Sequence, residues 1–237
     1  MNAGASPKSL ARVAGVFYLL TILTGAFAQG FVADKLVIFG DAATTANNIL
    51  AHKSLFQWGF TIYLIEMLCQ TTTIALFYDL LKPVNKSVSF LTAAVGLAGC
   101  AIKTVSRILY IAPLFLLGGA PFLNVFSREQ LQALALVFLR VNEAGAGIAL
   151  AFFGFATVLK GYLIIRSWFL PRVLGVLGLV AGLGLLMFLW PPLGLRLFTL
   201  IAALGLIGAL PQIVWLLVVG VNEARWKEQA ATASSAV

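Results

Sequence analysis

The sequence has few charged residues for its length. Of its 237 residues, 10% are charged and 61% are hydrophobic, whereas an ordinary soluble domain has roughly 25% charged residues. A composition this poor in charge excludes a water-soluble globular protein. The long apolar runs indicate instead that the chain crosses a membrane several times as helices.

Side chains that bind metal ions are also scarce. Zinc sites need three or four His, Cys or carboxylate ligands at suitable spacing, and the single histidine, His52, does not form such a set with the two cysteines, Cys69 and Cys100. Both cysteines fall in apolar segments, where a thiol packs as a small hydrophobic group. We therefore predict no metal ion and no cofactor.

Acidic residues are outnumbered, with 16 Lys and Arg against eight Asp and Glu. The basic residues are dispersed over loops and form no soluble basic face, so we expect no nucleic-acid partner. Outside the apolar cores, nine fall on one side of the membrane and four on the other: Lys8, Arg12, Lys82, Lys86, Lys160, Arg166, Arg172, Arg225 and Lys227 against Lys35, Lys53, Arg128 and Arg196. By the positive-inside rule, both termini are predicted to be cytoplasmic.

The apolar runs predict an all-α, polytopic membrane helical bundle. A span needs roughly 20 apolar residues, and the chain has room for six, at about 11–32, 54–81, 88–117, 130–165, 170–189 and 195–221. These spans leave no space for a soluble domain, so residues 1–223 are predicted to form a single six-helix transmembrane domain. The small, polar residues 224–237 are predicted to form a disordered cytoplasmic tail.

Local signals predict where some helices begin and pack. Asp41 is a candidate N-cap for a short surface helix over 42–51, and Ser127 with Gln130 forms a candidate capping box for the fourth span. Glycines concentrate in the last two spans. The spacing of Gly178 and Gly182 is typical of small residues that let two membrane helices approach closely.

Five ionisable residues remain inside the apolar runs, namely Glu66, Lys103, Arg107, Arg140 and Glu143. Counted from the outer helix ends at about 1.5 Å per residue, they lie roughly 15 to 21 Å deep. A charge near the bilayer centre costs roughly 2.5–3.5 kcal/mol, so five charges exposed to lipid are excluded. We expect these side chains to face one another or a wet cavity.

This pattern predicts a binding site rather than packing alone. Glu66 and Glu143 can pair with two of the three bases, which leaves one positive charge in excess and favours an anionic ligand. The expected ligand-binding residues are Lys103, Arg107, Arg140, Gln70, Tyr63, Tyr110 and Asn142. The catalytic residue of any reaction is unknown, with Glu66 and Glu143 as the candidates.

Four functions remain open from the residues. The preferred one is binding of an amphipathic, anionic lipid or isoprenoid-like small molecule at the buried charges. The alternatives are a metal-independent enzyme for acid-catalysed cyclisation or isomerisation of an apolar substrate, a small proton-coupled exporter, and a purely structural role. The expected partners are membrane lipids and the amphipathic molecule, with a homodimer left open.

Two stretches, GDAATTANNILAHKSLFQWG and GYLIIRSWFLPRVLGVLGLVAGLG, resemble the bacterial membrane family catalogued as domain of unknown function 4386. The resemblance covers most of the chain, from RVAGVFYLLTILTGAFA to the fifth expected span. It implies a six-span protein of the bacterial inner membrane, and it implies no activity. The family commonly carries His or Tyr near RVNEAGAG, where this chain departs from it with Arg140 and Glu143.

Overall fold

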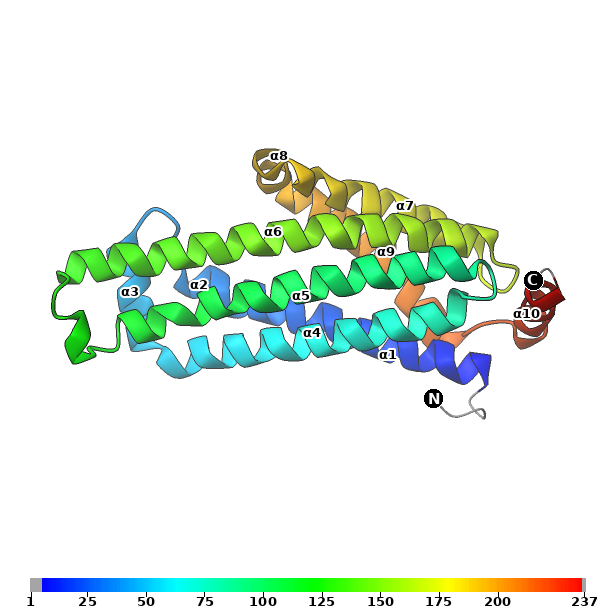
Figure 1. The fold of residues 1–237 in the computed structure, drawn as a ribbon, viewed down its shortest axis with the longest axis horizontal. Coiled ribbons are helices and arrows are strands. Elements are labelled where there is room, and N and C mark those ends of the chain that lie inside the picture. The colour runs from blue at the N-terminus through cyan, green and yellow to red at the C-terminus, as the bar shows by residue number, and fades with distance from the viewer. Residues whose placement is uncertain (1–5, 236–237) are drawn as a thin grey trace. The chain divides into compact units, whose positions relative to one another are not determined.

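The computed structural model describes residues 6–235, and the regular elements in that range are helices (Figure 1). The first apolar run forms α1 (Pro7–Ala26), the π-helical η1 (Phe27–Ala33) and α2 (Asp34–Leu36). The other elements are α3 (Ala42–Ala51), α4 (Lys53–Leu81), α5 (Lys86–Leu116), η2 (Pro121–Leu123), α6 (Arg128–Arg166), α7 (Arg172–Leu186), η3 (Met187–Leu189), α8 (Pro191–Arg196), α9 (Phe198–Val218) and α10 (Glu223–Ser235).

Six helical segments are long and apolar enough to cross a membrane. They are Pro7–Leu36, Lys53–Leu81, Lys86–Leu116, Arg128–Arg166, Arg172–Leu189 and Phe198–Val218. Each coincides with an expected span to within a few residues, so the all-α class and the six spans are confirmed. The chain is a multi-pass membrane protein.

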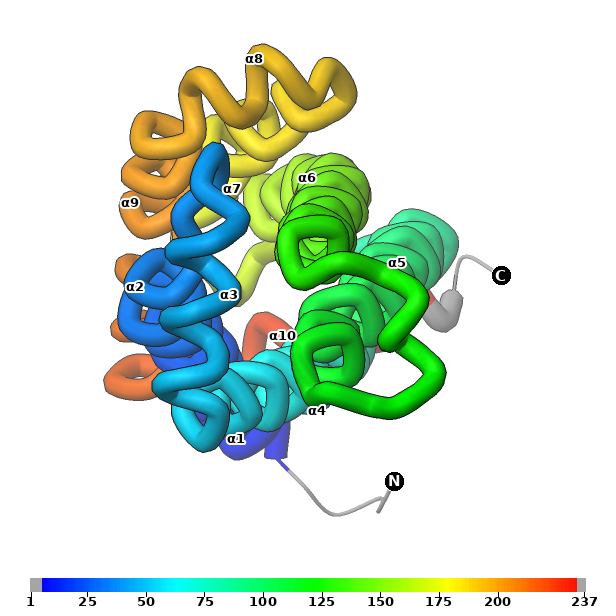
Figure 2. Tube along the Cα trace, turned by 90° about the vertical axis from the view of Figure 1, so that its left-hand side faces the viewer, coloured from blue at the N-terminus to red at the C-terminus, as the bar shows by residue number. Residues whose placement is uncertain are grey.

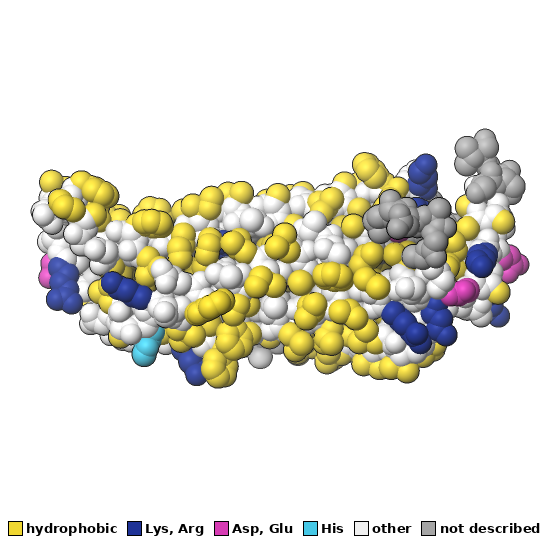
Figure 3. Space-filling model, turned by 90° about the horizontal axis from the view of Figure 1, so that it is seen from below, with side chains coloured by type: hydrophobic (Ala, Val, Ile, Leu, Met, Phe, Trp, Pro, Cys, Tyr) yellow, Lys and Arg dark blue, Asp and Glu magenta, His cyan; other side chains and the backbone are white. Residues whose placement is uncertain are grey.

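Large hydrophobic side chains are exposed on each of these segments. Examples, one from each segment in chain order, are Leu23, Leu68, Phe115, Ile148, Leu183 and Val214. Figure 3 shows such side chains spread over one face of the molecule. Surfaces of this kind are stable where the surrounding solvent is lipid, because lipid tails are as apolar as the side chains.

The contacts of the described chain group into two compact units. Unit 1 comprises residues 6–19, 69–100 and 147–235, and unit 2 comprises residues 20–68 and 101–146. The single domain expected over 1–223 stays a prediction. Helices α4, α5 and α6 contribute residues to both units, so each unit is a set of helical segments and not a separate stretch of sequence.

In unit 1, α7 and α9 lie side by side (Figure 1). The Gln212 amide of α9 donates a hydrogen bond to the Leu174 carbonyl of α7 at 3.0 Å, so a polar contact joins two very apolar helices. The core of the unit is a cluster of buried hydrophobic side chains from α4, α6 and α9, including Phe77, Leu80, Leu81, Leu163, Ile164 and Leu216.

The expected disordered tail is wrong for the described part of residues 224–237, because Glu223–Ser235 form α10. The side chain of Asn222 accepts a hydrogen bond from the backbone N–H of Arg225, as an N-cap residue does. Trp226 Nε1 donates to the Leu80 carbonyl at 2.9 Å, and Gln229 Oε1 accepts from the Trp168 backbone at 3.0 Å. These bonds attach the helix to unit 1.

Unit 2 contains the end of the first span, α3 and parts of α4, α5 and α6. The Asp41 carboxylate accepts a hydrogen bond from the Thr44 backbone at 2.9 Å, which confirms the predicted N-cap of α3. The predicted capping box is also confirmed, since Ser127 and Gln130 each bond the backbone N–H of the other. Helix α3 lies beside α2, as Figure 2 shows.

Candidate functional site

A buried ion pair joins α4 to α5 inside unit 2. Lys103 Nζ lies 2.6 Å from Glu66 Oε1, and both side chains are largely shielded. The pair forms because the two residues face each other from neighbouring helices at one level of the bundle. This confirms the expectation that Glu66 pairs with one of the bases, and Lys103 is that base.

Arg107, one turn further along α5, is buried without a carboxylate partner. Only 3% of its surface is exposed, and none of the ion pairs among residues 6–235 includes it. Its Nη1 donates a hydrogen bond to Asn142 Oδ1 of α6 at 3.0 Å. The guanidinium also lies over the Tyr63 ring, 3.6 Å from the centroid. Asn142 and Tyr63, both expected site residues, therefore hold a cation between three helices.

An aromatic cluster continues from Arg107 through the core of unit 2. The Tyr63 ring meets the Tyr110 ring edge-on at 5.3 Å, and Tyr110 stacks on Phe56 at 4.3 Å between centroids. Tyr63 also donates its hydroxyl hydrogen to Gln29 Oε1 of the π-helical η1 at 2.8 Å. The aromatic faces stabilise the cation by their negative quadrupole, and they also position the guanidinium.

Three buried polar atoms of this group have no hydrogen-bond partner among the described residues. They are Glu66 Oε2, Arg107 Nε and Tyr110 Oη. Leaving a buried donor or acceptor unpaired costs about 1–3 kcal/mol. We name Glu66, Lys103, Arg107, Tyr63, Tyr110 and Asn142 the Arg107 group, which contains two cations, one carboxylate and these three unpaired atoms.

The other two charges expected in this cluster lie apart from it, and the expectation that they are buried is wrong. Arg140 and Glu143 pair with each other on α6 at 3.1 Å, with 52% and 34% of their side chains exposed. The Arg140 guanidinium covers the ring of Phe39 at 3.9 Å. Residues two apart on a helix point to nearly opposite sides, so Arg140 faces away from the side on which Asn142 meets Arg107.

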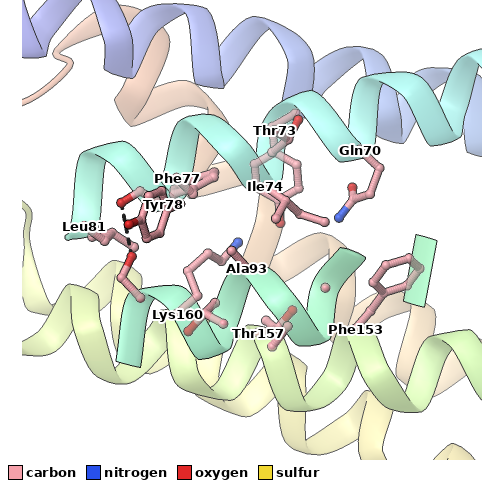
Figure 4. A pocket seen from close by; sticks show the side chains of 15 residues that line it. Gln70, Thr73, Ile74, Phe77, Tyr78, Leu81, Ala93, Phe153, Thr157 and Lys160 are labelled. Carbon is pink, nitrogen blue, oxygen red and sulfur yellow. Dashed lines mark hydrogen bonds between the residues drawn. The ribbon is translucent and has the colours of Figure 1, made fainter. Parts of the chain in front are cut away.

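Gln70 belongs to unit 1, where it lines a cavity of about 70 Å³. Figure 4 shows Gln70 of α4 and Lys160 of α6 pointing into this cavity. The Lys160 ammonium lies 4.6 Å from the centroid of the Tyr18 ring and 4.7 Å from that of Phe77. Gln70 was expected beside Glu66 because the two are one helical turn apart, and its side chain instead faces a separate site.

Two residues of these sites did not come out of the sequence as candidates. Gln29 is a lone polar residue near the end of the first apolar run, and that position was the available signal. Lys160 was counted among the cytoplasmic basic residues that lie outside the apolar cores. Its polar companion at helical spacing, Thr157, carries no charge and gave no signal of a cavity.

The arrangement in unit 2 can bind and orient a charged group. Arg107 offers a donor to an anion, Lys103 neutralises Glu66, and Glu66 Oε2 can accept a hydrogen bond. Within residues 6–235, no three His, Cys, Asp or Glu side chains are grouped so that they could hold a metal ion.

Comparison with known proteins gives one match. A family model described as Domain of unknown function (DUF4386) matches residues 13–220, which is most of the chain. No curated protein and no solved structure matches the sequence.

Proposed function

The chain belongs to the family described as Domain of unknown function (DUF4386), and on that premise we propose that its Arg107 group binds the head group of an anionic, amphipathic lipid or isoprenoid-like molecule. The observation that carries the proposal is Arg107, which is buried without a carboxylate and has an unpaired Nε. The proposal places the protein in the bacterial inner membrane, with the larger set of nine basic residues on the cytoplasmic side.

A role in stability does not account for Arg107. Replacing buried charges by apolar side chains is often neutral or stabilising, because the charge loses its hydration on burial. Here the guanidinium gains one hydrogen bond and one ring contact. Among the described residues it makes no ion pair with a carboxylate that could offset the lost hydration. An anionic ligand would supply the negative charge that no described carboxylate provides to Arg107.

The free atoms of the Arg107 group also indicate the kind of head group. Arg107 Nε is a donor and Glu66 Oε2 is an acceptor, and both are buried in the same unit. A head group that carries an anionic oxygen and a hydroxyl can satisfy both atoms. Lys103 Nζ lies 2.6 Å from Glu66 Oε1 and neutralises the carboxylate, which reduces its repulsion of an incoming anion.

Native mass spectrometry of the full chain in neutral detergent tests the proposal. Phosphatidylglycerol, which has an anionic phosphate and hydroxyls, is titrated against phosphatidylcholine, and bound lipids are also extracted from the purified protein. In the Arg107→Met variant we expect binding of phosphatidylglycerol to weaken about tenfold or more, since charge-assisted hydrogen bonds are among the strong ones. The melting temperature of the lipid-free variant is expected to stay equal or rise.

Arg128→Met is the matched control. Arg128 is an exposed cation at the start of α6 and bonds only Asn47, at 3.4 Å, so its replacement removes the same charge from the surface. We expect this variant to bind phosphatidylglycerol as the wild type does. Equal loss in both variants, or no loss in Arg107→Met, would show that the head group does not bind at Arg107.

A further inference from the structure

The cavity in unit 1 is separate from the Arg107 group in residues and in chemistry. It lies between α1, α4, α5 and α6 and has a volume of about 70 Å³. By the same measure one water molecule needs roughly 10–15 Å³, and a cavity of about 150 Å³ holds benzene. The cavity therefore has room for a small polar group.

Lys160 gives this cavity a positive charge that no acidic residue balances. All eight Asp and Glu residues of the sequence lie within residues 6–235, and none of the ion pairs in that range includes Lys160. Its ammonium lies over the ring faces of Tyr18 and Phe77, and it has no hydrogen-bond partner within residues 6–235. Ring faces stabilise a cation, but they leave its three hydrogen-bond donors without acceptors.

Several other hydroxyl side chains of the lining are already used, since Ser89 donates to the Tyr78 carbonyl at 3.1 Å. Thr73 and Thr92 donate their hydroxyl hydrogens to backbone carbonyls of their own helices, at 2.8 Å each, so they cannot donate to a ligand. Gln70 and Thr157 point into the cavity from α4 and α6, as Lys160 does (Figure 4). Lys160, Gln70 and Thr157 therefore offer donors to the cavity.

We propose that this cavity is a second binding site, which takes a small oxyanion, either a phosphate or a carboxylate group, on Lys160. One ammonium and the amide of Gln70 provide charge-assisted and neutral donors to such a group. The volume fits the oxyanion alone, so any chain attached to it lies outside the cavity. The site does not depend on the function proposed for the Arg107 group, because the two share no residue.

The test is a double-mutant cycle over the two sites, with the wild type, Lys160→Met, Arg107→Met and the double variant. Native mass spectrometry counts phosphatidylglycerol molecules bound above the phosphatidylcholine background. In a parallel arm, inorganic phosphate is added and the melting temperature is recorded. We expect Lys160→Met to lose one bound lipid or the stabilisation by phosphate, with affinity about tenfold weaker, whether or not Arg107 is present.

The two arms distinguish the source of the oxyanion. Loss of a bound lipid in Lys160→Met indicates a lipid head group, and loss of the phosphate effect alone indicates a free anion; both support the site. Lys160→Arg keeps the charge and is expected to bind within about threefold of the wild type. Lys86→Met removes an exposed cation at the start of α5 and is expected to change neither readout.

Unchanged binding of both probes in a folded Lys160→Met protein overturns the second site. If that variant does not fold, Gln70→Leu gives the same decision, since it removes a neutral donor and keeps the cation. Loss of binding in Arg107→Met with no change in Lys160→Met supports the function proposed for unit 2 and rejects the site in unit 1. The reverse result rejects the former and supports the latter.

Discussion

At the residue scale, two glycines allow the helices of unit 2 to approach the side chains of the Arg107 group. A Cβ added at Gly25 would lie 2.9 Å from Glu66 Oε1. A Cβ added at Gly59 would lie 2.8 Å from Tyr110 Oη and 2.7 Å from Val32 Cγ1. Distances below 3.0 Å require a neighbour to move, so these positions fix how closely the first span and α4 pack on the site.

Gly59→Ala is therefore expected to destabilise the protein. The added methyl group would displace the buried Tyr110 or Val32, and overpacking of this kind costs roughly 1–3 kcal/mol. Gly205→Ala is the matched control because nothing lies within 4 Å of its added Cβ, and alanine is the better helix former. Thermal unfolding in detergent should show a lower melting temperature only for Gly59→Ala. Equal melting temperatures for the two variants would contradict the close approach at Gly59.

The residue scale is also where the sequence was least informative about the site. Glu66, Lys103 and Arg107 were found because charge is rare in apolar runs. A depth counted along a helix does not give the direction in which a side chain points. It also does not give the length by which the helix extends beyond the membrane. For that reason Arg140, at a similar counted depth in the long α6, was expected inside and is half exposed.

At the scale of the elements, the glycines of α7 serve two interfaces. Gly178 faces the Gln212 amide of α9, as the expected pairing of the last two spans requires. Gly182 faces α6 instead, where an added Cβ would lie 2.8 Å from the Val158 backbone nitrogen. The spacing of small residues predicts a close helix contact, and it does not identify the partner, because α7 has neighbours on two sides.

The cap of α3 is the element whose stability depends on pH in a defined direction. The Thr44 hydroxyl and backbone N–H donate to the exposed Asp41 carboxylate, and these bonds hold the pKa of Asp41 below its ordinary value. A carboxyl with a lowered folded pKa stabilises the helix above its unfolded pKa, and this contribution is lost as the pH falls through the folded pKa.

Hydrogen exchange of the first turn of α3 measures this effect. We expect the Thr44 amide to exchange faster in Asp41→Asn and Asp41→Ala than in the wild type at neutral pH, with the larger change in Asp41→Ala because asparagine also caps helices. The difference between the wild type and Asp41→Ala should shrink at acidic pH. A difference that is independent of pH would show that the carboxylate is not the cap.

At the scale of the whole molecule, six spans require both termini to lie on one side of the membrane. The distribution of basic residues predicts that this side is the cytoplasm. Reporter fusions after residue 237 and in the loop between α5 and α6 test the orientation. We expect a cytoplasmic reporter to be active only at the C-terminus and a periplasmic reporter only in the loop. The opposite pattern would reverse the topology.

The fold could be predicted from the sequence to a large extent, because membrane helices need long apolar runs and such runs are visible in the sequence itself. The α10 helix was missed because Ala, Thr and Ser in the tail were judged by composition, while Trp226 and Gln229 attach it through contacts distant in sequence. The cavity around Lys160 was missed for a similar reason, since the residues of its lining come from four helices.

The most direct test is a diffraction map of the protein crystallised from a lipidic mesophase doped with phosphatidylglycerol. If Arg107 binds the head group, an oxygen of the lipid phosphate lies about 3 Å from Arg107 Nε. Lipid density would then continue along α5. A map in which Arg107 Nε is bonded to a protein atom or to water alone, at full occupancy and in the presence of the lipid, would contradict the function proposed for the Arg107 group.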